Sequence, residues 1–523
     1  MQRIGKADRP AERAEVKIWA ARGEYEPFQI VITAGTENTR SVYLEASELI
    51  GPERNVIPSA NLAFYREYYI HVVNPSPDPG RGNRPLGRGW YPDALIPFLD
   101  PETGRRTEGD IPSAPFDVNP NQNQPVWVDV YVPIDARPGL YTGSVRVSSA
   151  QAEVRIPVSL HVWSFSLPLE PTLKSSFGMH EPLLSDRRVH EILLKHKIMP
   201  VSVNPGDARE FQQKLGQNTS ALRFWGNSDR NKCIMDPPPS PDQIASELRQ
   251  YPANLPVYVY PADEIDPCPN LFNTVRSWAV NMRAVDPRIK NLVTVSPVPA
   301  LYDVGGMGRS AVDIWTLLPK AYESAGDRIK IVQAKGDEIW SYTALVQDSY
   351  SPKWEIDFAP INYRIQPGFI SQSLGLTGIL YWRVDQWTAA PWQDVTGYRI
   401  DGNTYPGEGM LVYPGREAGA SSVVPSMRLK WIREGVEDYE YVAILKRLGR
   451  GDWALAHVHR AAADWRIWTQ DVKVLESVRR ELGDEIEKLW PSEALNSSPR
   501  SAARERLVEP GCCAVRKRSS QER

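Results

Sequence analysis

The stretch Leu255-Pro-Val-Tyr-Val-Tyr-Pro-Ala-Asp-Glu-Ile-Asp-Pro267 is the starting point for interpreting this 523-residue chain. Its apolar run at 257–260 predicts a buried strand. Two adjacent carboxylates, Asp263 and Glu264, follow the run, and a helical pattern then covers 270–282. Carboxylates at the carboxyl end of a parallel strand occupy the edge where α/β barrels carry their chemistry. The stretch therefore predicts a barrel strand that ends in a candidate active site.

Strand and helix patterns alternate on both sides of this stretch, from residue 172 to residue 425. We expect strands at 174–178, 199–203, 221–224, 257–260, 289–295, 329–333 and 378–382. Helical segments are expected at 186–196, 208–215, 241–251, 270–282 and 361–374, and a helical or mixed segment at 311–324. This alternation implies parallel β-α units. The span suits a (β/α)8 TIM-like barrel, and a doubly wound open sheet is the alternative.

Residues 1–168 have a different pattern, with short alternating runs separated by turn residues and no helical periodicity. This pattern is typical of a β-sandwich. The segment 74–123 is rich in Pro, Gly, Asn and Arg and predicts a long loop. Such a loop either runs over the surface or reaches a neighbouring active site.

The C-terminal part of the chain is helical in pattern. Apolar residues at helical spacing predict helices at 429–448, 453–468 and 472–489, so we assign 426–495 to a C-terminal helical segment. The tail 496–523 is polar, charged and aperiodic, which predicts disorder. The predicted organisation is therefore multidomain: a β-sandwich, a barrel, a helical segment and a tail.

Composition narrows the classes of partner. The formal net charge of −3 is nearly neutral, so nucleic acid is not expected as a partner. No apolar run is long enough to span a membrane. The N-terminus lacks an apolar signal core. The protein therefore either stays in the cytoplasm or has lost a leader and acts outside it, and the sequence leaves its localisation and oligomeric state open.

Metal chemistry is not indicated by the sequence. The four cysteines form no C-x-x-C pair, and the seven histidines include no H-E-x-x-H motif. We therefore expect neither a metal nor another cofactor. Cys233 and Cys268 are candidates for a disulfide, but the sequence does not decide whether they pair.

Three Asp-Glu dipeptides compete for a catalytic role. The pair at 484–485 lies within an amphipathic helix and fits a solvated face. The pair at 337–338 follows the expected strand 329–333 and is a real rival. The pair at 263–264 follows the most apolar and aromatic strand and is the preferred candidate, although no catalytic pair at all remains an alternative.

Adjacent carboxylates suit a particular kind of sugar hydrolysis. In the usual retaining arrangement, two carboxylates lie about 5 Å apart on opposite sides of the scissile bond. Neighbours at one strand end cannot easily do this. They fit a substrate-assisted route, in which the 2-acetamido oxygen of the substrate attacks the anomeric carbon. One carboxylate then orients the acetamido group while the other serves as general acid and later as base.

Aromatic residues near predicted strand ends form a second set of candidates. Sugar rings stack on such side chains at a cleft, although core packing explains many tryptophans equally well. The substrate-binding candidates are Tyr260, Asp313, Trp315, Trp340, Tyr342, Tyr381, Trp382 and Trp387.

Longer motifs give the chain a family resemblance. They include Gly378-Ile-Leu-Tyr-Trp-Arg, Pro391-Trp392, Gly407-Glu-Gly-Met-Leu-Val-Tyr-Pro-Gly415 and Ser426-Met-Arg-Leu-Lys-Trp-Ile-Arg-Glu-Gly-Val-Glu-Asp-Tyr-Glu-Tyr441. With shorter matches from residue 20 onward, they resemble glycoside hydrolase family 123 and its uncharacterised relatives. The resemblance implies a β-sandwich, a (β/α)8 barrel and a helical end. One departure is the insertion of Ile265-Asp266 between the acid pair and Pro267, where relatives commonly have proline directly.

The resemblance also implies an activity. It implies a metal-free, retaining β-N-acetylgalactosaminidase, with Glu264 as acid/base and Asp263 orienting the acetamido group. The expected partner is thus a glycan or glycoconjugate substrate. Two alternatives remain open: a non-catalytic carbohydrate-binding or surface protein on the same scaffold, and a glycosidase that uses Asp337 or Glu338.

Overall fold

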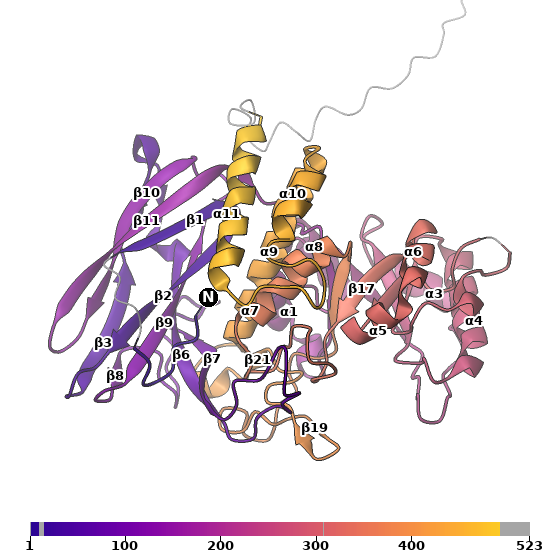
Figure 1. The fold of residues 1–523 in the computed structure, drawn as a ribbon, viewed down its shortest axis with the longest axis horizontal. Coiled ribbons are helices and arrows are strands. Elements are labelled where there is room, and N and C mark those ends of the chain that lie inside the picture. The colour runs from indigo at the N-terminus through magenta and orange to yellow at the C-terminus, as the bar shows by residue number, and fades with distance from the viewer. Residues whose placement is uncertain (1, 10–14, 307, 492–523) are drawn as a thin grey trace, which may run out of the picture.

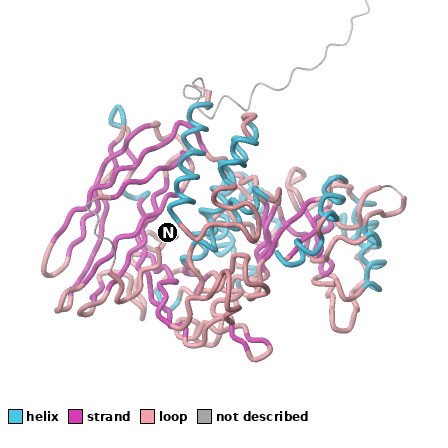
Figure 2. Tube along the Cα trace, in the orientation of Figure 1, coloured by secondary structure: helices cyan, strands magenta, loops and turns pink. Residues whose placement is uncertain are grey.

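The computed structural model describes residues 2–9, 15–306 and 308–491 (Figure 1). The tail for which we predicted disorder, 496–523, lies outside these residues. Strands dominate the N-terminal part of the chain, whereas helices and strands mix in the remainder (Figure 2). The protein is therefore multidomain, with a sheet-rich N-terminal domain followed by a parallel barrel and C-terminal helices.

The N-terminal domain contains two sheets that share one hydrophobic core. The larger sheet consists of β1 (Val16–Arg22), β3 (Thr39–Ala46), β4 (Leu49–Ile50), β5 (Val56–Ile57), β8 (Phe116–Val118), β10 (Gly139–Ser148) and β11 (Glu153–Ser166). The smaller has the order β2 (Tyr25–Thr33), β9 (Asn123–Tyr131), β6 (Leu62–Val72), β7 (Gly89–Pro97). Alternate residues of β9, Val126, Val128 and Val130, pack against Val145 and Leu160 of the larger sheet. This period-two pattern is the one that the sequence displays.

The prediction of one long loop over 74–123 is wrong in part. The segment contains β7 and β8, and β7 forms the edge of the smaller sheet. Pro92 and Pro97 within its sequence hid the strand, because proline is tolerated on edge strands but lowers strand propensity. The remaining loop does reach the barrel: Asn83 N–H donates to Ser349 O over 2.8 Å, and Leu86 N–H donates to Asp357 O over 2.6 Å.

The second domain is built on a nearly closed parallel sheet of seven strands. In spatial order they are β12 (Lys174–Phe177), β18 (Gly378–Tyr381), β17 (Glu338–Tyr342), β16 (Ile314–Leu317), β15 (Lys290–Val293), β14 (Val257–Ala262) and β13 (Ser220–Trp225). Residues 199–201 lie between the two edges. Phe177 N–H donates to Met199 O, Val201 N–H to Phe177 O, and Ala221 N–H to Val201 O. The expected strand at 199–203 is thus reduced to these backbone contacts.

Helices follow most barrel strands. They are α1 (Arg187–Lys195), α2 (Pro205–Leu215), α3 (Pro241–Leu248), α4 (Phe272–Val285), α5 (Pro319–Ala325), α6 (Asp327–Ala334), α7 (Ile361–Ile365) and α8 (Ser371–Ser373). A π-helical turn at Gln366–Ile370 joins α7 to α8, where Pro367 interrupts the expected helix. The prediction of a strand at 329–333 is wrong: this apolar run belongs to α6 and packs Ile329 and Val332 inward. A short apolar run does not distinguish strand from buried helix.

The C-terminal helices are α9 (Met427–Arg447), α10 (Gly451–Val458) and α11 (Val472–Leu489). Helix α9 is buried along 427–445 although more than a third of these residues are charged. Its Arg428 pairs with Asp93 of β7, and Lys430 and Arg433 pair with Asp129 of β9. This helix therefore joins the barrel to the N-terminal domain through buried ion pairs.

Candidate active site

The acid pair lies at the carboxyl end of β14, at the rim of the barrel. Parallel strands β13 and β15 flank β14, so their following loops surround the pair. The loop after β13 approaches closely because it begins with Gly226: a Cβ there would lie 2.0 Å from Pro261 O. Asp263 is exposed, while Glu264 is half-buried. The pair is thus open to a ligand from the solvent side.

Asp263 is held by hydroxyl groups. Its Oδ1 accepts hydrogen bonds from Tyr260 Oη over 2.7 Å and from Thr294 Oγ1 over 2.6 Å. Its backbone N–H donates to Ser228 Oγ over 2.8 Å. Neutral donors of this kind orient a carboxylate without neutralising its charge. Asp263 is therefore a fixed, charged acceptor at the rim.

Glu264 has a different set of partners. Its Oε1 accepts a hydrogen bond from Tyr342 Oη over 2.8 Å, and its Oε2 forms an ion pair with Arg230. Its N–H donates to Thr294 Oγ1 over 2.6 Å. Its backbone φ of 47° lies in the left-handed region, which a non-glycine residue rarely adopts. The two neighbouring acids are thus presented in different directions and environments.

Both tyrosines at the pair remain neutral donors. Burial and the nearby Asp263 carboxylate raise the pKa of the Tyr260 phenol well above its usual value. Burial and Asp263 likewise raise the pKa of Tyr342 far above the usual range. Because neither phenol ionises at neutral pH, both keep donating to the carboxylates.

The Ile265-Asp266 insertion is accommodated without exposing its apolar side chain. Ile265 is fully buried and belongs to the core cluster that lies under the helices. Asp266 is exposed, and its Oδ1 accepts from Ser296 N–H over 3.0 Å. These contacts anchor the loop directly after the acid pair.

The rival pair at 337–338 lies at the opposite end of the barrel. It lies at the start of β17, with Asp337 just before the strand and Glu338 as its first residue, because the segment taken for a preceding strand is α6. Glu338 forms ion pairs with Lys174 and Lys290. Burial would raise its pKa, but the two lysines outweigh burial and lower the pKa to about 2. The geometry gives this pair a structural role, away from the rim.

The aromatic candidates divide between rim and interior. Tyr260 and Tyr342 contact the acid pair. Trp382 and Trp387 follow β18 at the same end, but Trp382 Nε1 donates to Glu408 over 2.5 Å and Trp387 Nε1 to Val412 O over 2.8 Å. Tyr381 is fully buried. The rim therefore receives four of these candidates.

The other candidates lie elsewhere. Trp340 is fully buried inside the barrel, beneath the rim. Asp313 precedes β16, at the end far from the acids, and pairs with Arg283. Trp315 points out of the barrel, and its Nε1 donates to Asp337 over 2.9 Å. The structure does not bring these three side chains to the acid pair.

Three rim residues were missed by the sequence reasoning. Trp225 ends β13, is 39% exposed and packs edge-on against Tyr260 at 6.3 Å between centroids. Arg230 lies on the following loop, and Thr294 follows β15. Trp225 directly ends an expected strand, so its position was a usable signal. The sequence contains no comparable signal for Thr294, because a single threonine is common at strand ends.

A disulfide joins Cys233 to Cys268, resolving the pairing that the sequence left open. It connects the loop that carries Arg230 to the loop that follows the acid pair. Because this link is covalent, Arg230 is restrained close to Glu264.

Metal binding has no evident basis at the rim. Among residues 2–9, 15–306 and 308–491, no group of three or more His, Cys, Asp or Glu side chains is arranged to hold a metal ion. Nor does any helix in these ranges have the length and apolar character needed to cross a membrane.

A sheet-rich domain joined to a parallel barrel with acids on its carboxyl rim has the architecture of an enzyme whose active site lies at that rim. Two family models match the sequence: the glycoside hydrolase 123 N-terminal domain at residues 5–149 and the glycoside hydrolase 123 catalytic domain at residues 304–445. Together they span more than half of the chain. The chain belongs to glycoside hydrolase family 123, so its substrate class is a glycan. The acid pair lies between the two matched ranges.

One solved structure agrees with the family at the level of the fold. A family 123 glycoside hydrolase from Clostridium perfringens, studied for glycolipid glycan hydrolysis, is 14% identical with a TM-score of 0.60. The match covers 91% of this chain and 93% of that one. Bacteroides uniformis beta-glucuronidase 2 is 10% identical with a TM-score of 0.29, over 75% of this chain and 47% of that one. No curated protein matches the sequence.

Proposed function

We propose that the protein removes terminal β-linked N-acetylhexosamine, above all N-acetylgalactosamine, by retaining, substrate-assisted hydrolysis. The observation that carries this proposal is the pair of adjacent carboxylates with unlike partners at the end of β14. Asp263 accepts hydrogen bonds from two hydroxyl groups, whereas Glu264 accepts one from a phenol and pairs with the Arg230 cation. Unlike environments suit two carboxylates with unlike roles.

In the first half of the reaction, Asp263 accepts the acetamido N–H and stabilises the positive charge that develops there. The acetamido oxygen attacks the anomeric carbon while Glu264, as general acid, gives its proton to the departing glycosidic oxygen. In the second half, Glu264 takes a proton from water as the water opens the cyclic intermediate. Two inversions at one carbon retain the β configuration.

Arg230 has to release Glu264 before this acid can act. An ion pair stabilises the charged carboxylate, whereas a general acid must carry a proton. The Arg230 side chain is 51% exposed, so it can move into solvent at small cost. We therefore assign the observed ion pair to the substrate-free state.

We also propose a more detailed division of the chain into domains. With residues 199–201 as an eighth strand position, the sheet becomes a (β/α)8 barrel over 172–425. In the N-terminal domain, the hydrophobic core that the two sheets share supports a β-sandwich over 1–168. The segment 426–495 supplies the C-terminal helices.

The test is hydrolysis of aryl β-N-acetylgalactosaminide and β-N-acetylglucosaminide by the wild type, Glu264→Gln and Asp263→Asn. Loss of the acid should lower kcat/KM by about 100-fold or more. The matched control is Asp266→Asn, which changes an exposed carboxylate two residues away and should keep its rate within about threefold. An active wild type with an undiminished Glu264→Gln rate would remove Glu264 from this role.

A thiazoline mimic of the cyclised intermediate tests the mechanism separately. Tight competitive inhibition is expected, because transition-state-like ligands bind far more tightly than substrates. Absence of inhibition in an active enzyme would count against participation of the acetamido group.

The second candidate function is a non-catalytic carbohydrate-binding protein on the same scaffold. The ion pair between Arg230 and Glu264 favours it, because a permanently paired Glu264 stays deprotonated. Binding of N-acetylhexosamine glycans without turnover, by both the wild type and Arg230→Gln, would support this alternative.

A further inference from the structure

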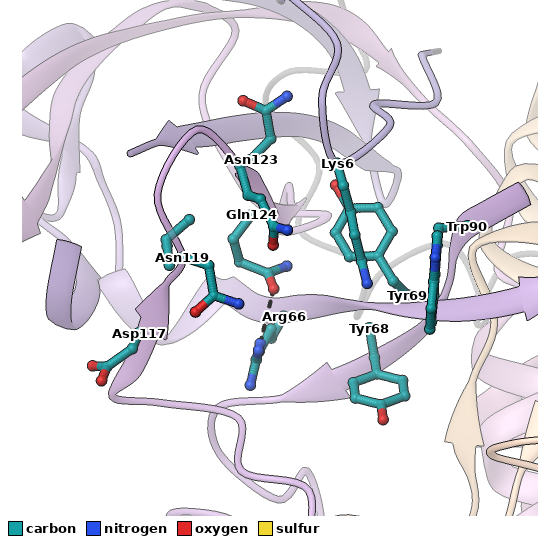
Figure 3. Close-up of a pocket in the computed structure, with 11 residues that line it drawn as sticks. Lys6, Arg66, Tyr68, Tyr69, Trp90, Asp117, Asn119, Asn123 and Gln124 are labelled. Atoms are coloured by element: carbon teal, nitrogen blue, oxygen red, sulfur yellow. Dashed lines mark hydrogen bonds between the residues drawn. The ribbon is translucent and has the colours of Figure 1, made fainter. Parts of the chain in front are cut away.

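A cavity of about 230 Å³ opens on the N-terminal domain, away from the barrel rim (Figure 3). Strands β6 and β7 and the loop between β8 and β9 form its walls, and Lys6 of the N-terminal segment borders it. The volume is below the roughly 300–1,000 Å³ of sites for drug-sized ligands, which suits a single sugar ring. None of the residues discussed for catalysis lies in it.

Two cations face this cavity without a carboxylate partner among the described residues. Lys6 forms no ion pair there; its Nζ lies 3.4 Å from the centroid of the Trp90 ring. Arg66 donates to neutral acceptors, from Nε to Gln124 Oε1 over 3.1 Å and from Nη1 to Pro112 O over 2.9 Å. Burial lowers the pKa of both side chains, although the charge of Asp117 partly offsets this for Arg66. A buried cation without a directly bonded counter-charge is costly, and an anionic ligand would offset that cost.

The one carboxylate among the residues that line this cavity, Asp117, is hydrogen-bonded outside it. Asp117 Oδ1 accepts a hydrogen bond from Ser41 N–H over 2.8 Å. In Figure 3 its side chain points away from Lys6, on the far side of Asn119. Lys6 and Arg66 therefore set the charge of the interior.

The remaining wall has the chemistry of a sugar site. Trp90 is 45% exposed; His71 stacks on one face of its ring at 4.4 Å between centroids, and Lys6 Nζ covers the other face. Tyr68 stands beside it (Figure 3). The exposed amide of Asn119 faces them across the cavity, with both donors and an acceptor for hydroxyl groups. Aromatic rings with nearby amides bind the apolar face and the hydroxyls of a sugar.

We propose that this cavity is an accessory binding site for an anionic sugar, a glycan residue that bears a carboxylate or a sulfate. The anionic group draws Lys6 off the Trp90 ring and pairs with it and with Arg66, and the sugar ring lies along the face of Trp90 that Lys6 leaves. The proposal uses the glycan substrate class of the family and is independent of the mechanism at Asp263 and Glu264. It assigns to the N-terminal domain the role of holding an acidic part of the same glycan.

The test is calorimetric titration of the full chain with glucuronic acid, N-acetylgalactosamine 6-sulfate, neutral N-acetylgalactosamine and inorganic sulfate. At least one anionic sugar should bind about tenfold more tightly than the neutral sugar and than sulfate alone. The two anionic probes distinguish a carboxylate from a sulfate ligand. Raising NaCl from 50 to 500 mM should weaken this binding several-fold, because the contact is ionic.

Variants connect the binding to the cavity. Lys6→Gln and Trp90→Ala change solvent-facing groups and should each weaken the anionic sugar about tenfold. The matched control is Lys17→Gln, which removes an exposed lysine of the same domain and should change nothing. Glu264→Gln should also leave this binding intact, which separates it from the proposed catalysis. Equal affinity for neutral and anionic sugars, unaltered binding in Lys6→Gln, or no binding at millimolar sugar would each overturn the proposal.

Discussion

Helix α9 and the barrel rim both depend on charged side chains but use them in opposite ways. Along α9, buried charges face buried opposite charges, as in the double contact of Arg428 with Asp93 at 2.9 and 3.0 Å. At the rim, Asp263 and Glu264 remain partly exposed, and hydroxyl groups supply most of their hydrogen bonds. Charges of the first kind fix the arrangement of domains, while charges of the second kind stay available to a ligand.

This difference explains which parts of the sequence carry long motifs that reveal the family. Every residue of α9 from 427 to 445 is buried, so a long motif is constrained together. The rim needs only the acid pair and a few hydroxyls brought from separate strands. In this chain the long motifs therefore indicate the fold, and the short acid pair indicates the candidate active site.

The largest expected effect is at the charged helix. Asp129→Ala leaves Lys430 and Arg433 buried without their shared counter-ion. Breaking a buried pair in this way costs about 3–5 kcal/mol of unfolding free energy, measurable by urea denaturation. The control is Glu45→Ala, which breaks an exposed pair with Arg146 and should cost about 1 kcal/mol or less. Equal effects of the two variants would contradict the distinction between the regions.

A buried carboxylate without a strong cationic partner should respond to pH. Burial raises the pKa of Asp357 to about 6, against donation from Ser76. The native state thus keeps its proton up to about pH 6, whereas the unfolded chain releases it near pH 4. The protonated carboxyl group contributes about 2–3 kcal/mol to the free energy of unfolding below pH 4, and this contribution is lost as the pH rises to about 6.

Asp357→Asn should abolish this part of the pH dependence. The measurement is the free energy of unfolding at several pH values between 4 and 7 for both proteins. Curves that run parallel would show that Asp357 does not titrate in this range. Asp129 makes the contrast: burial disfavours its charge, but Arg433 and Lys430 outweigh burial and hold its pKa well below the usual range.

A smaller effect is expected from the hydroxyl that joins the two acids. Thr294→Val removes the donor to Asp263 and the acceptor for Glu264 N–H. We expect kcat on an N-acetylhexosaminide to fall about tenfold, because misplaced catalytic groups lose orientation. Thr294→Ser keeps the hydroxyl and should retain most of the rate. A large loss of stability in the valine variant with unchanged kcat would assign Thr294 to folding instead.

The smallest effect is expected from the exposed ring beside Tyr260. Trp225→Ala removes a candidate stacking surface for the sugar, worth about 1 kcal/mol. KM should rise about fivefold while kcat and the unfolding temperature change little, and Trp225→Phe should restore part of the affinity. An unchanged KM would place the sugar elsewhere on the rim.

Much of the scaffold was predictable because periodicity is a local property. The expected helix at 472–489 is confirmed as α11, and the strand at 257–260 lies within β14. The segment 329–333 failed because a five-residue apolar run fits a strand and a buried helix equally well. That one error also placed 337–338 after a strand, when it lies at the start of β17.

Less of the candidate site was predictable, because its parts meet only in the fold. Tyr260 and Tyr342 were found from their places at the ends of apolar runs. Arg230 was not, since its contact with Glu264 depends on the path of a loop and on the disulfide. Asp313 and Trp315 show the converse: residue type suggested a ligand site, but strand direction decided the end of the barrel.

The left-handed backbone of Glu264 has a consequence for how this protein can change over time. Such a conformation costs a side-chain-bearing residue about 1 kcal/mol, and glycine would adopt it freely. Glycine would relieve that strain but would lose more chain entropy on folding, so stability alone gives little preference between the two residues. Under the proposed function, the need for the acid keeps a side chain in this conformation, and its replacement by glycine would mark a chain that no longer turns over substrate.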